Sequence, residues 1–149
     1  MQMTDTVRAV LDKKGRHVLA VSPETSVYDA LRMMAEHDIG ALIVLRDGRL
    51  AGVFSERDYA RKVILHGKAS RETSVEEVMS ERPAAVTPSH TVQDCMELMT
   101  GYRVRHLPVV EDDEVIGMIS IGDTVNWIIS AQEETIQHLR AFIAGSYPA

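Results

Sequence analysis

Residues suited to holding a ligand occur twice in this sequence. Ser55-x-x-Asp58 and Ser120-x-x-Asp123 each follow an apolar stretch and precede a helical pattern. A hydroxyl residue and an acidic residue at this spacing form a capping box at a helix N-terminus. Such a turn also presents free backbone N–H groups to an anion, and its carboxylate can accept hydrogen bonds from two sugar hydroxyls. Capping and ligand binding are both open, and they are compatible.

Basic side chains accompany the first Ser-Asp turn (residues 55–58) more than the second (residues 120–123). Arg57 lies inside the first turn, and Arg105 and His106 precede an apolar run. The forked guanidinium of arginine and a histidine ring N–H suit a phosphate group. The residues that match Arg105 and His106 in the other half of the chain are Gly40 and Ala41, which carry no charge. The sequence therefore predicts two unequal sites, with the better anion site at the first turn.

The sequence shows no coherent catalytic set and no metal motif. Cys95 is the single cysteine and falls on the apolar face of a predicted helix, so we expect it in the core. The six histidines form no H-x-x-x-H pair, and neither a GxxxxGK[ST] loop nor a GxGxxG loop is present. We therefore predict that the chain is not an enzyme and uses no metal or catalytic cofactor.

Composition places the chain among ordinary globular proteins. It has 149 residues, 45% of them hydrophobic and 26% charged, with a formal net charge of −6. One compact domain or two small ones can be built from this length. The sequence has no dense basic stripe with aromatics, no apolar run of about 20 residues and no signal-peptide core, which argues against nucleic-acid binding, membrane insertion and secretion. We expect a cytoplasmic protein.

The chain contains an internal repeat. Residues 20–64 align with residues 85–129 without a gap. Each copy predicts a short strand, a helix, a hairpin of two strands and a second helix. The predicted first strands are Val18–Val21 and Ala84–Thr87. Glycines 52 and 117 lie inside strand patterns, where a missing side chain marks close approach of a ligand or of neighbouring backbone.

The same pattern divides the chain into five segments. We predict an N-terminal helix, two repeats separated by a linker, and a helical extension in which Ile136, Leu139 and Ile143 form an apolar stripe before Gly145. The boundaries are 1–15 for the helix, 16–67 for the first repeat, 68–81 for the linker, 82–130 for the second repeat and 131–149 for the extension.

The repeat resembles a tandem pair of cystathionine-β-synthase (CBS) domains, called a Bateman module. The resemblance rests on GVFSERD at residues 52–58, GMISIGD at residues 117–123 and RHLPVV at residues 105–110, and it covers about residues 16–130. It implies an α/β (α+β) fold in which two β-α-β-β-α repeats pack around an internal pseudo-twofold axis.

The resemblance also implies adenosine nucleotide binding in the clefts between the repeats. We expect the first cleft to be the better phosphate site and the second to hold a less charged ligand group or none. The first cleft would use Ser55, Arg57, Asp58, Pro83, Ala84, Val104, Arg105 and His106, and the second would use Ser120, Asp123, Val18, Leu19, Ile39 and Ala41.

The function predicted from these features is regulatory. The chain would bind AMP, ADP, ATP or NAD(H) and signal occupancy to a partner protein. The helices that contain Met33, Met34, Leu98 and Met99 carry a second apolar face, which predicts a homodimer. The alternative is a protein-interaction module that needs no nucleotide, in which the Ser-Asp turns only cap helices.

Overall fold

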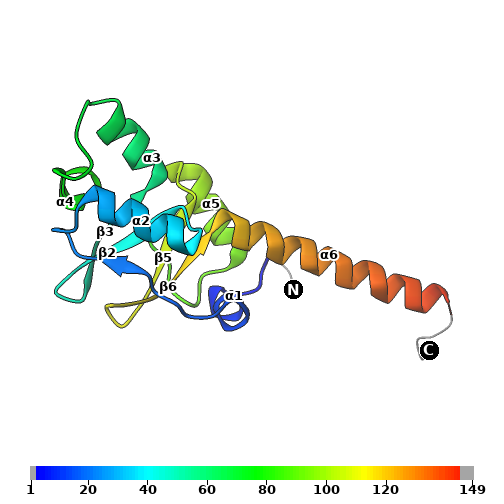
Figure 1. The fold of residues 1–149 in the computed structure, drawn as a ribbon. Helices are drawn as coiled ribbons and strands as arrows, with labels where there is room; N and C mark the ends of the chain where they lie inside the picture. Colours follow the sequence, from blue (N-terminus) through cyan, green and yellow to red (C-terminus); the bar gives the residue numbers. More distant parts are fainter. Residues whose placement is uncertain (1–2, 145–149) are drawn as a thin grey trace.

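The computed structural model describes residues 3–144 and contains two similar α/β units (Figure 1). The predicted fold class and both predicted hairpins are confirmed. Residues 145–149, with the predicted helix end at Gly145, lie outside the described residues. The helices are α1 (Val7–Lys14), α2 (Val27–His37), α3 (Glu56–Asp58), the π-helical η1 (Tyr59–Ile64), α4 (Val75–Val78), α5 (Val92–Tyr102) and α6 (Ile121–Ile143), and the strands are β1 (Ala20–Val21), β2 (Ala41–Arg46), β3 (Arg49–Ser55), β4 (Ser80–Glu81), β5 (His106–Glu111) and β6 (Glu114–Ser120).

Each unit is built on one antiparallel hairpin. In the first, β2 and β3 pair from Ala41 opposite Ser55 to Arg46 opposite Arg49, and β1 and β4 extend the sheet to the order β1-β2-β3-β4. In the second, β5 and β6 pair from His106 opposite Ser120. Two apolar runs separated by a short polar turn explain both hairpins. In each hairpin, the first residue of the first strand therefore lies opposite the serine that begins the Ser-Asp turn at the end of the second strand.

The strand predicted at 84–87 is wrong as a strand. Only Val86 in this segment forms a bridge to β5. It lies parallel to Val109, and its N–H donates to the carbonyl of Pro108 at 2.9 Å. Pro83 and Pro88 flank this segment and lack the N–H groups that a longer ladder needs. The predicted strand at 18–21 likewise contracts to Ala20–Val21.

Each of the two short helices α1 and α4 precedes one unit in the chain and packs into the core of the other. α4, which precedes the second unit, packs Val75 and Val78 into the core of the first. α1, which precedes the first unit, packs Val10 and Leu11 into the core of the second. Matching bridges, Ser26 to Ser74 and Thr6 to Thr91, dock the two helices. The segment expected to be a linker thus closes the first core, and the N-terminal helix closes the second.

Gly52 and Gly117 lie where neighbouring segments of the chain pack closely against the hairpins. A Cβ on Gly52 would lie 2.7 Å from the backbone oxygen of Ser80, and one on Gly117 would lie 2.9 Å from the side chain of Leu11. Of the two reasons that the sequence left open for these glycines, the structure shows the approach of neighbouring protein.

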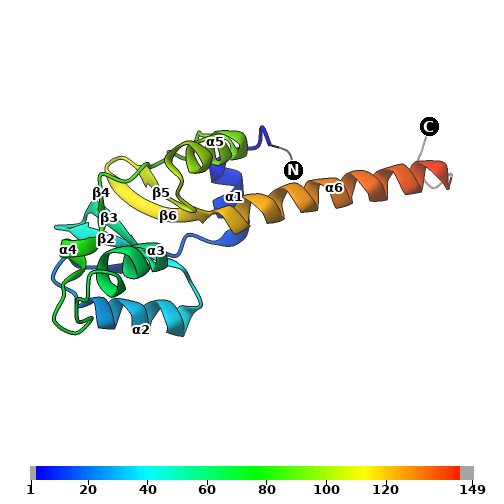
Figure 2. The same ribbon diagram turned by 90° about the horizontal axis from the view of Figure 1, so that it is seen from above.

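The units stack through their sheets (Figure 2). Helices α2 and α3 lie on one side, α5 lies on the other and the hairpins meet between them. Ala41, Ile43 and Val53 form the buried centre of this contact, with Val115 and Met118 packed against them from the second unit. The Ser-Asp turns stand beside this shared apolar layer, and α6 projects beyond the stacked units.

Candidate functional site

The first Ser-Asp turn is a capping box with a fully engaged carboxylate. The Ser55 N–H and Oγ–H donate to Asp58 Oδ2 at 2.9 and 3.0 Å, and the Asp58 N–H donates to Ser55 Oγ at 3.2 Å. Ser80 Oγ donates to the other oxygen, Oδ1, at 3.1 Å, and Lys62 Nζ lies 3.2 Å from it. Asp58 is buried. The structure therefore assigns this side chain to capping and to holding β4.

The second Ser-Asp turn forms the same capping box, but its carboxylate pairs with a lysine that is distant in the sequence. The Ser120 N–H donates to Asp123 Oδ2 at 2.8 Å. Lys14 Nζ donates to the same oxygen at 2.6 Å and to the carbonyl of Met118 at 2.7 Å. Lys14 is 109 residues from Asp123, so no local pattern in the sequence indicates it. The second turn thus has a cationic group that the comparison of the two repeats does not reveal.

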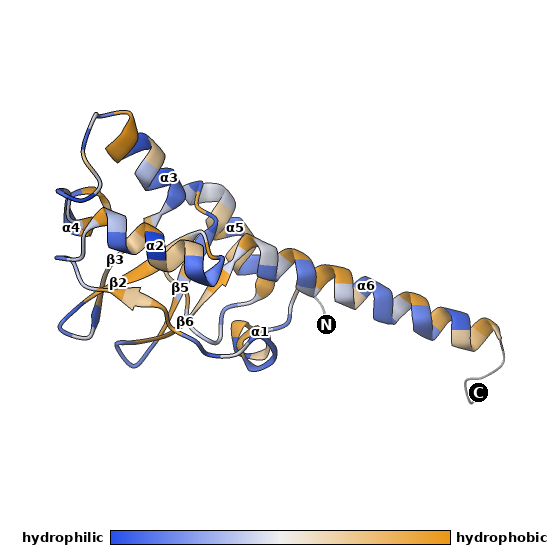
Figure 3. Cartoon of the chain, in the orientation of Figure 1, coloured by the Kyte–Doolittle hydropathy of each residue, from blue (hydrophilic) through white to orange (hydrophobic). Residues whose placement is uncertain are grey.

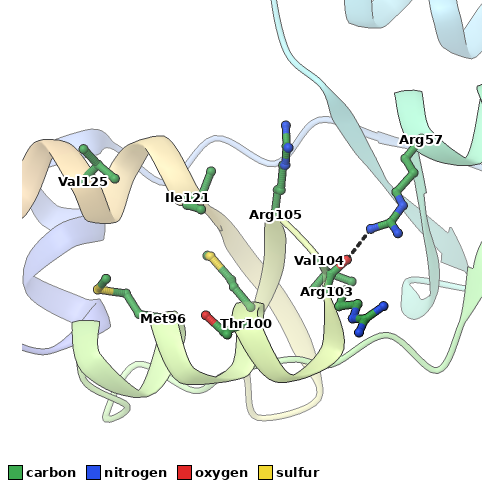
Figure 4. Close-up of a pocket in the computed structure, with 9 residues that line it drawn as sticks. Arg57, Met96, Thr100, Arg103, Val104, Arg105, Ile121 and Val125 are labelled. Carbon is green, nitrogen blue, oxygen red and sulfur yellow. Dashed lines mark hydrogen bonds between the residues drawn. The ribbon is translucent and has the colours of Figure 1, made fainter.

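A pocket of about 340 Å³ lies mostly on the second unit, and its lining includes Arg57 of the first turn and Ile121 of the second (Figure 4). Arg57 reaches it from the first unit and donates from Nη1 to the carbonyl of Arg103 at 2.6 Å. Arg103 and Arg105 border it from the segment between α5 and β5. The remaining lining comes from α5, α6 and this segment: Met96, Met99, Thr100, Val104, Ile121 and Val125. Figure 4 shows the side chain of Arg57 reaching toward residues 103–105, whereas those of Arg103 and Arg105 point away from the apolar residues. The wall is therefore mainly apolar with arginines at its edge, which suits a ligand with a flat apolar part and an anionic part.

The pocket unites part of the predicted set. Arg57, Val104 and Arg105 were predicted site residues and line it. Arg103 and the lining residues of α5 and α6 were not predicted. Arg103 takes a left-handed backbone at the C-cap of α5, with φ of 55°. Its carbonyl accepts from Arg57 of the other unit, a contact that only the tertiary structure creates.

His106 lies where the two units touch. A Cβ on Gly40 would be 3.5 Å from His106 Cε1 and 3.9 Å from the carboxyl carbon of Glu56. Burial lowers the pKa of His106, and the positive charge of Lys14 adds to this, while Asp123 opposes it. The side chain therefore faces both Ser-Asp turns, with the neutral ring favoured.

The other predicted site residues serve mostly in packing. Leu19 and Ile39 pack against the first core, and Ala84 packs against the second. Val18 packs into the contact between the units, and Ala41 is fully buried there. Pro83 is half-buried. Cys95 is buried in the second core, as predicted, and burial raises the pKa of its thiol to about 11.

His106 predicts a pH dependence of stability. The unfolded chain takes up the proton near the ordinary histidine pKa of about 6.5, before the folded chain does, so the free energy of unfolding should fall as pH falls through that value. His106→Gln should flatten the slope between pH 7 and pH 5 in urea denaturation. An NMR titration that places the pKa of His106 at or above its ordinary value would contradict this expectation.

Two stacked α/β units, each with a Ser-Asp turn at the end of its hairpin, define a tandem-repeat module. The CBS domain family model matches residues 5–65 and 75–130. The chain therefore belongs to the CBS domain family and contains two CBS repeats, which confirms the resemblance drawn from the sequence.

Stand-alone CBS proteins are among the relatives. The chain is 40% identical over 151 aligned residues to the CBS domain-containing protein CBSX3, mitochondrial, of Arabidopsis thaliana, covering 95% of this chain and 73% of that protein. It is 31% identical to the CBS domain-containing protein YhcV of Bacillus subtilis, covering 77% of this chain and 81% of the relative.

Solved structures share the fold. One is a proposed signal-transduction protein with CBS domains from Burkholderia ambifaria MC40-6, which is 45% identical to this chain. Its TM-score is 0.82, and the match covers 85% of this chain and 96% of that one. The CBS-domain containing protein ATU1752 of Agrobacterium tumefaciens is 40% identical, with a TM-score of 0.77 and coverage of 81% and 97%. Within residues 3–144, no helix is long and apolar enough to cross a membrane, and no cluster of three or more His, Cys, Asp or Glu residues could hold a metal ion.

Proposed function

We propose that this chain is a regulatory module that binds an adenosine nucleotide between its two CBS repeats. The observation that carries the proposal is the apolar pocket whose lining includes Arg57 of the first repeat together with Arg103 and Arg105 of the second, with Arg57 bonded to the carbonyl of Arg103. Its volume of about 340 Å³ lies at the low end for ligand pockets, which favours AMP, ADP or ATP over the longer NAD(H).

The arginines supply a way to signal occupancy. An anion between Arg57 and Arg105 contacts both repeats, so its affinity depends on their relative angle. A ligand shifts that angle only by the difference in its affinity for the two arrangements. Binding would thereby present a different surface to a regulated partner. The predicted homodimer and cytoplasmic location belong to this proposal, although the name of the Arabidopsis relative places that protein in mitochondria.

The alternative function is a protein-interaction module that needs no nucleotide. The observations that favour it are the complete use of Asp58 in capping and the exposed apolar residues along α6. It predicts that no nucleotide stabilises the protein.

Thermal unfolding with AMP, ADP, ATP, NAD⁺ and NADH separates the two functions. A ligand at 100 times its Kd adds about 2.7 kcal/mol of stability, which should raise Tm by roughly 5–10 °C for a chain of this size. Arg105→Ala should remove most of the rise. Arg32→Ala removes the same charge from an exposed pair with Glu36 on α2 and should keep the rise. A flat response across the panel would overturn the nucleotide proposal.

A further inference from the structure

The C-terminal part of α6 projects from the two stacked units as a single helix (Figures 1 and 2). Near its start, Thr124 and Trp127 are buried against the second unit, and the Trp127 indole donates to Asp5 at 3.1 Å. Beyond Ala131 the helix has no buried residue within the described chain. The projecting part, residues 131–143, therefore lies outside the core of this chain.

An apolar stripe runs along this projecting helix (Figure 3). Leu139 is 57% exposed, Phe142 65% and Ile143 83%. Ile136, nearer the body on the same stripe, is 48% exposed. Monomers rarely expose contiguous apolar patches larger than a few hundred Å². Four large apolar side chains that their own chain leaves uncovered are therefore typical of an interface rather than of a free surface.

The spacing of the stripe is that of a coiled coil. Steps of four and three residues alternate strictly from one seam residue to the next: Val125, Ile129, Gln132, Ile136, Leu139 and Ile143. Five of these six residues are apolar, and Gln132 is the polar exception. Apolar residues at this heptad spacing pack as knobs into the holes of another helix that has the same repeat. The pattern therefore favours a partner helix with a matching seam, as a second copy of α6 provides.

The flanking charges are self-complementary in one orientation. Glu133 and Arg140 occupy the same flanking position in successive heptads and are both exposed. When two α6 helices run antiparallel with Ile136 facing the partner's Leu139, Glu133 faces the partner's Arg140, and the twofold axis repeats the pair. In a parallel pair, Glu133 would face the partner's Ile128 and Arg140 the partner's Thr135, so the charges would have no opposite.

The register is also set by charge and by the shape of the molecule. The antiparallel overlap runs from Gln132, opposite the partner's Ile143, to Ile143, opposite the partner's Gln132. It lies entirely in the projecting part, so the two bodies stay at opposite ends. A shift of one heptad would bring Glu133 against the partner's Glu133, and like charges at close range oppose pairing. We propose that residues 132–143 of α6 form an antiparallel coiled coil with α6 of a second copy of this chain.

Cysteine cross-linking reads this pairing directly. Ile136→Cys and Leu139→Cys are made separately, one with an affinity tag, and oxidised alone or as a mixture. The proposal predicts a disulfide-linked species only in the mixture, because Ile136 faces the partner's Leu139. Cys95 is buried and should not compete. Linkage in either variant alone indicates parallel helices and overturns the proposal, as does the absence of linkage in all three samples.

Charge reversal tests the register independently. In the mixed cross-linking assay, Glu133→Lys and Arg140→Glu should each lower the linked fraction several-fold, because each variant opposes like charges. The double variant, Glu133→Lys with Arg140→Glu, restores opposite charges across the pair and should recover the yield of the parent. If the double variant links no better than the single ones, the proposed pairing of Glu133 with Arg140 is wrong. The readout requires no nucleotide, so its failure leaves the proposed function standing.

Discussion

Asp58→Ala is expected to lower the free energy of unfolding by about 3 kcal/mol, from the lost cap and the hydrogen-bond donors left unpaired. Asp58 is buried, and its two oxygens accept from the backbone and hydroxyl of Ser55 and from the hydroxyl of Ser80. Lys62 loses its ion-pair partner as well. The substitution therefore loosens the start of α3 and the attachment of β4 together. Urea denaturation followed by circular dichroism measures the change.

The matched control for Asp58 is Asp29→Ala. Asp29 stands at the same N3 position of α2, where its backbone N–H donates to Ser26, and its side chain is exposed. We expect a loss of no more than about 0.5 kcal/mol there, as for surface substitutions generally. Equal losses at the two positions would show that the contacts of Asp58 with Ser80 and Lys62 contribute nothing. Because Asp58→Ala perturbs folding, a change in ligand affinity in this variant would not by itself locate the ligand.

Local patterns in the sequence were sufficient for the elements of each repeat. The capping boxes at Ser55 and Ser120 could be predicted because both partners lie within four residues. The hairpins could be predicted because their apolar runs are interrupted by a short polar turn. Each of these features depends on interactions between near neighbours in the chain, which spacing alone reveals.

The contacts that complete the candidate site are not local. Lys14 reaches Asp123 only because α1 docks on the second repeat, and Arg103 meets Arg57 only because the two units stack. The fourth hydrogen bond of the first turn comes from Ser80, in a segment that the sequence indicated as a linker. These partners could not be predicted, because docking and stacking depend on the shapes of surfaces that form only after folding.

Leu11→Ala is expected to have the largest effect, a loss of about 4 kcal/mol, within the range for a fully buried leucine in a well-packed core. Leu11 has no exposed surface and packs, with Val7 and Val10, against the core of the second repeat. Its side chain also lies where a Cβ on Gly117 would be, so the glycine has no side chain that could fill the cavity. The loss should appear in urea denaturation as a lower midpoint with an unchanged slope.

The control for Leu11 lies on the same helix. Asp12 is exposed and pairs with Arg16 at 3.1 Å, so Asp12→Ala should change the free energy of unfolding by less than about 1 kcal/mol. If α1 did not contribute to the second core, both substitutions would leave the stability of the body unchanged. A large loss for Leu11→Ala alone would instead show that the second CBS repeat is completed by the segment that precedes the first, so the two repeats cannot fold as separate units cut at residue 68.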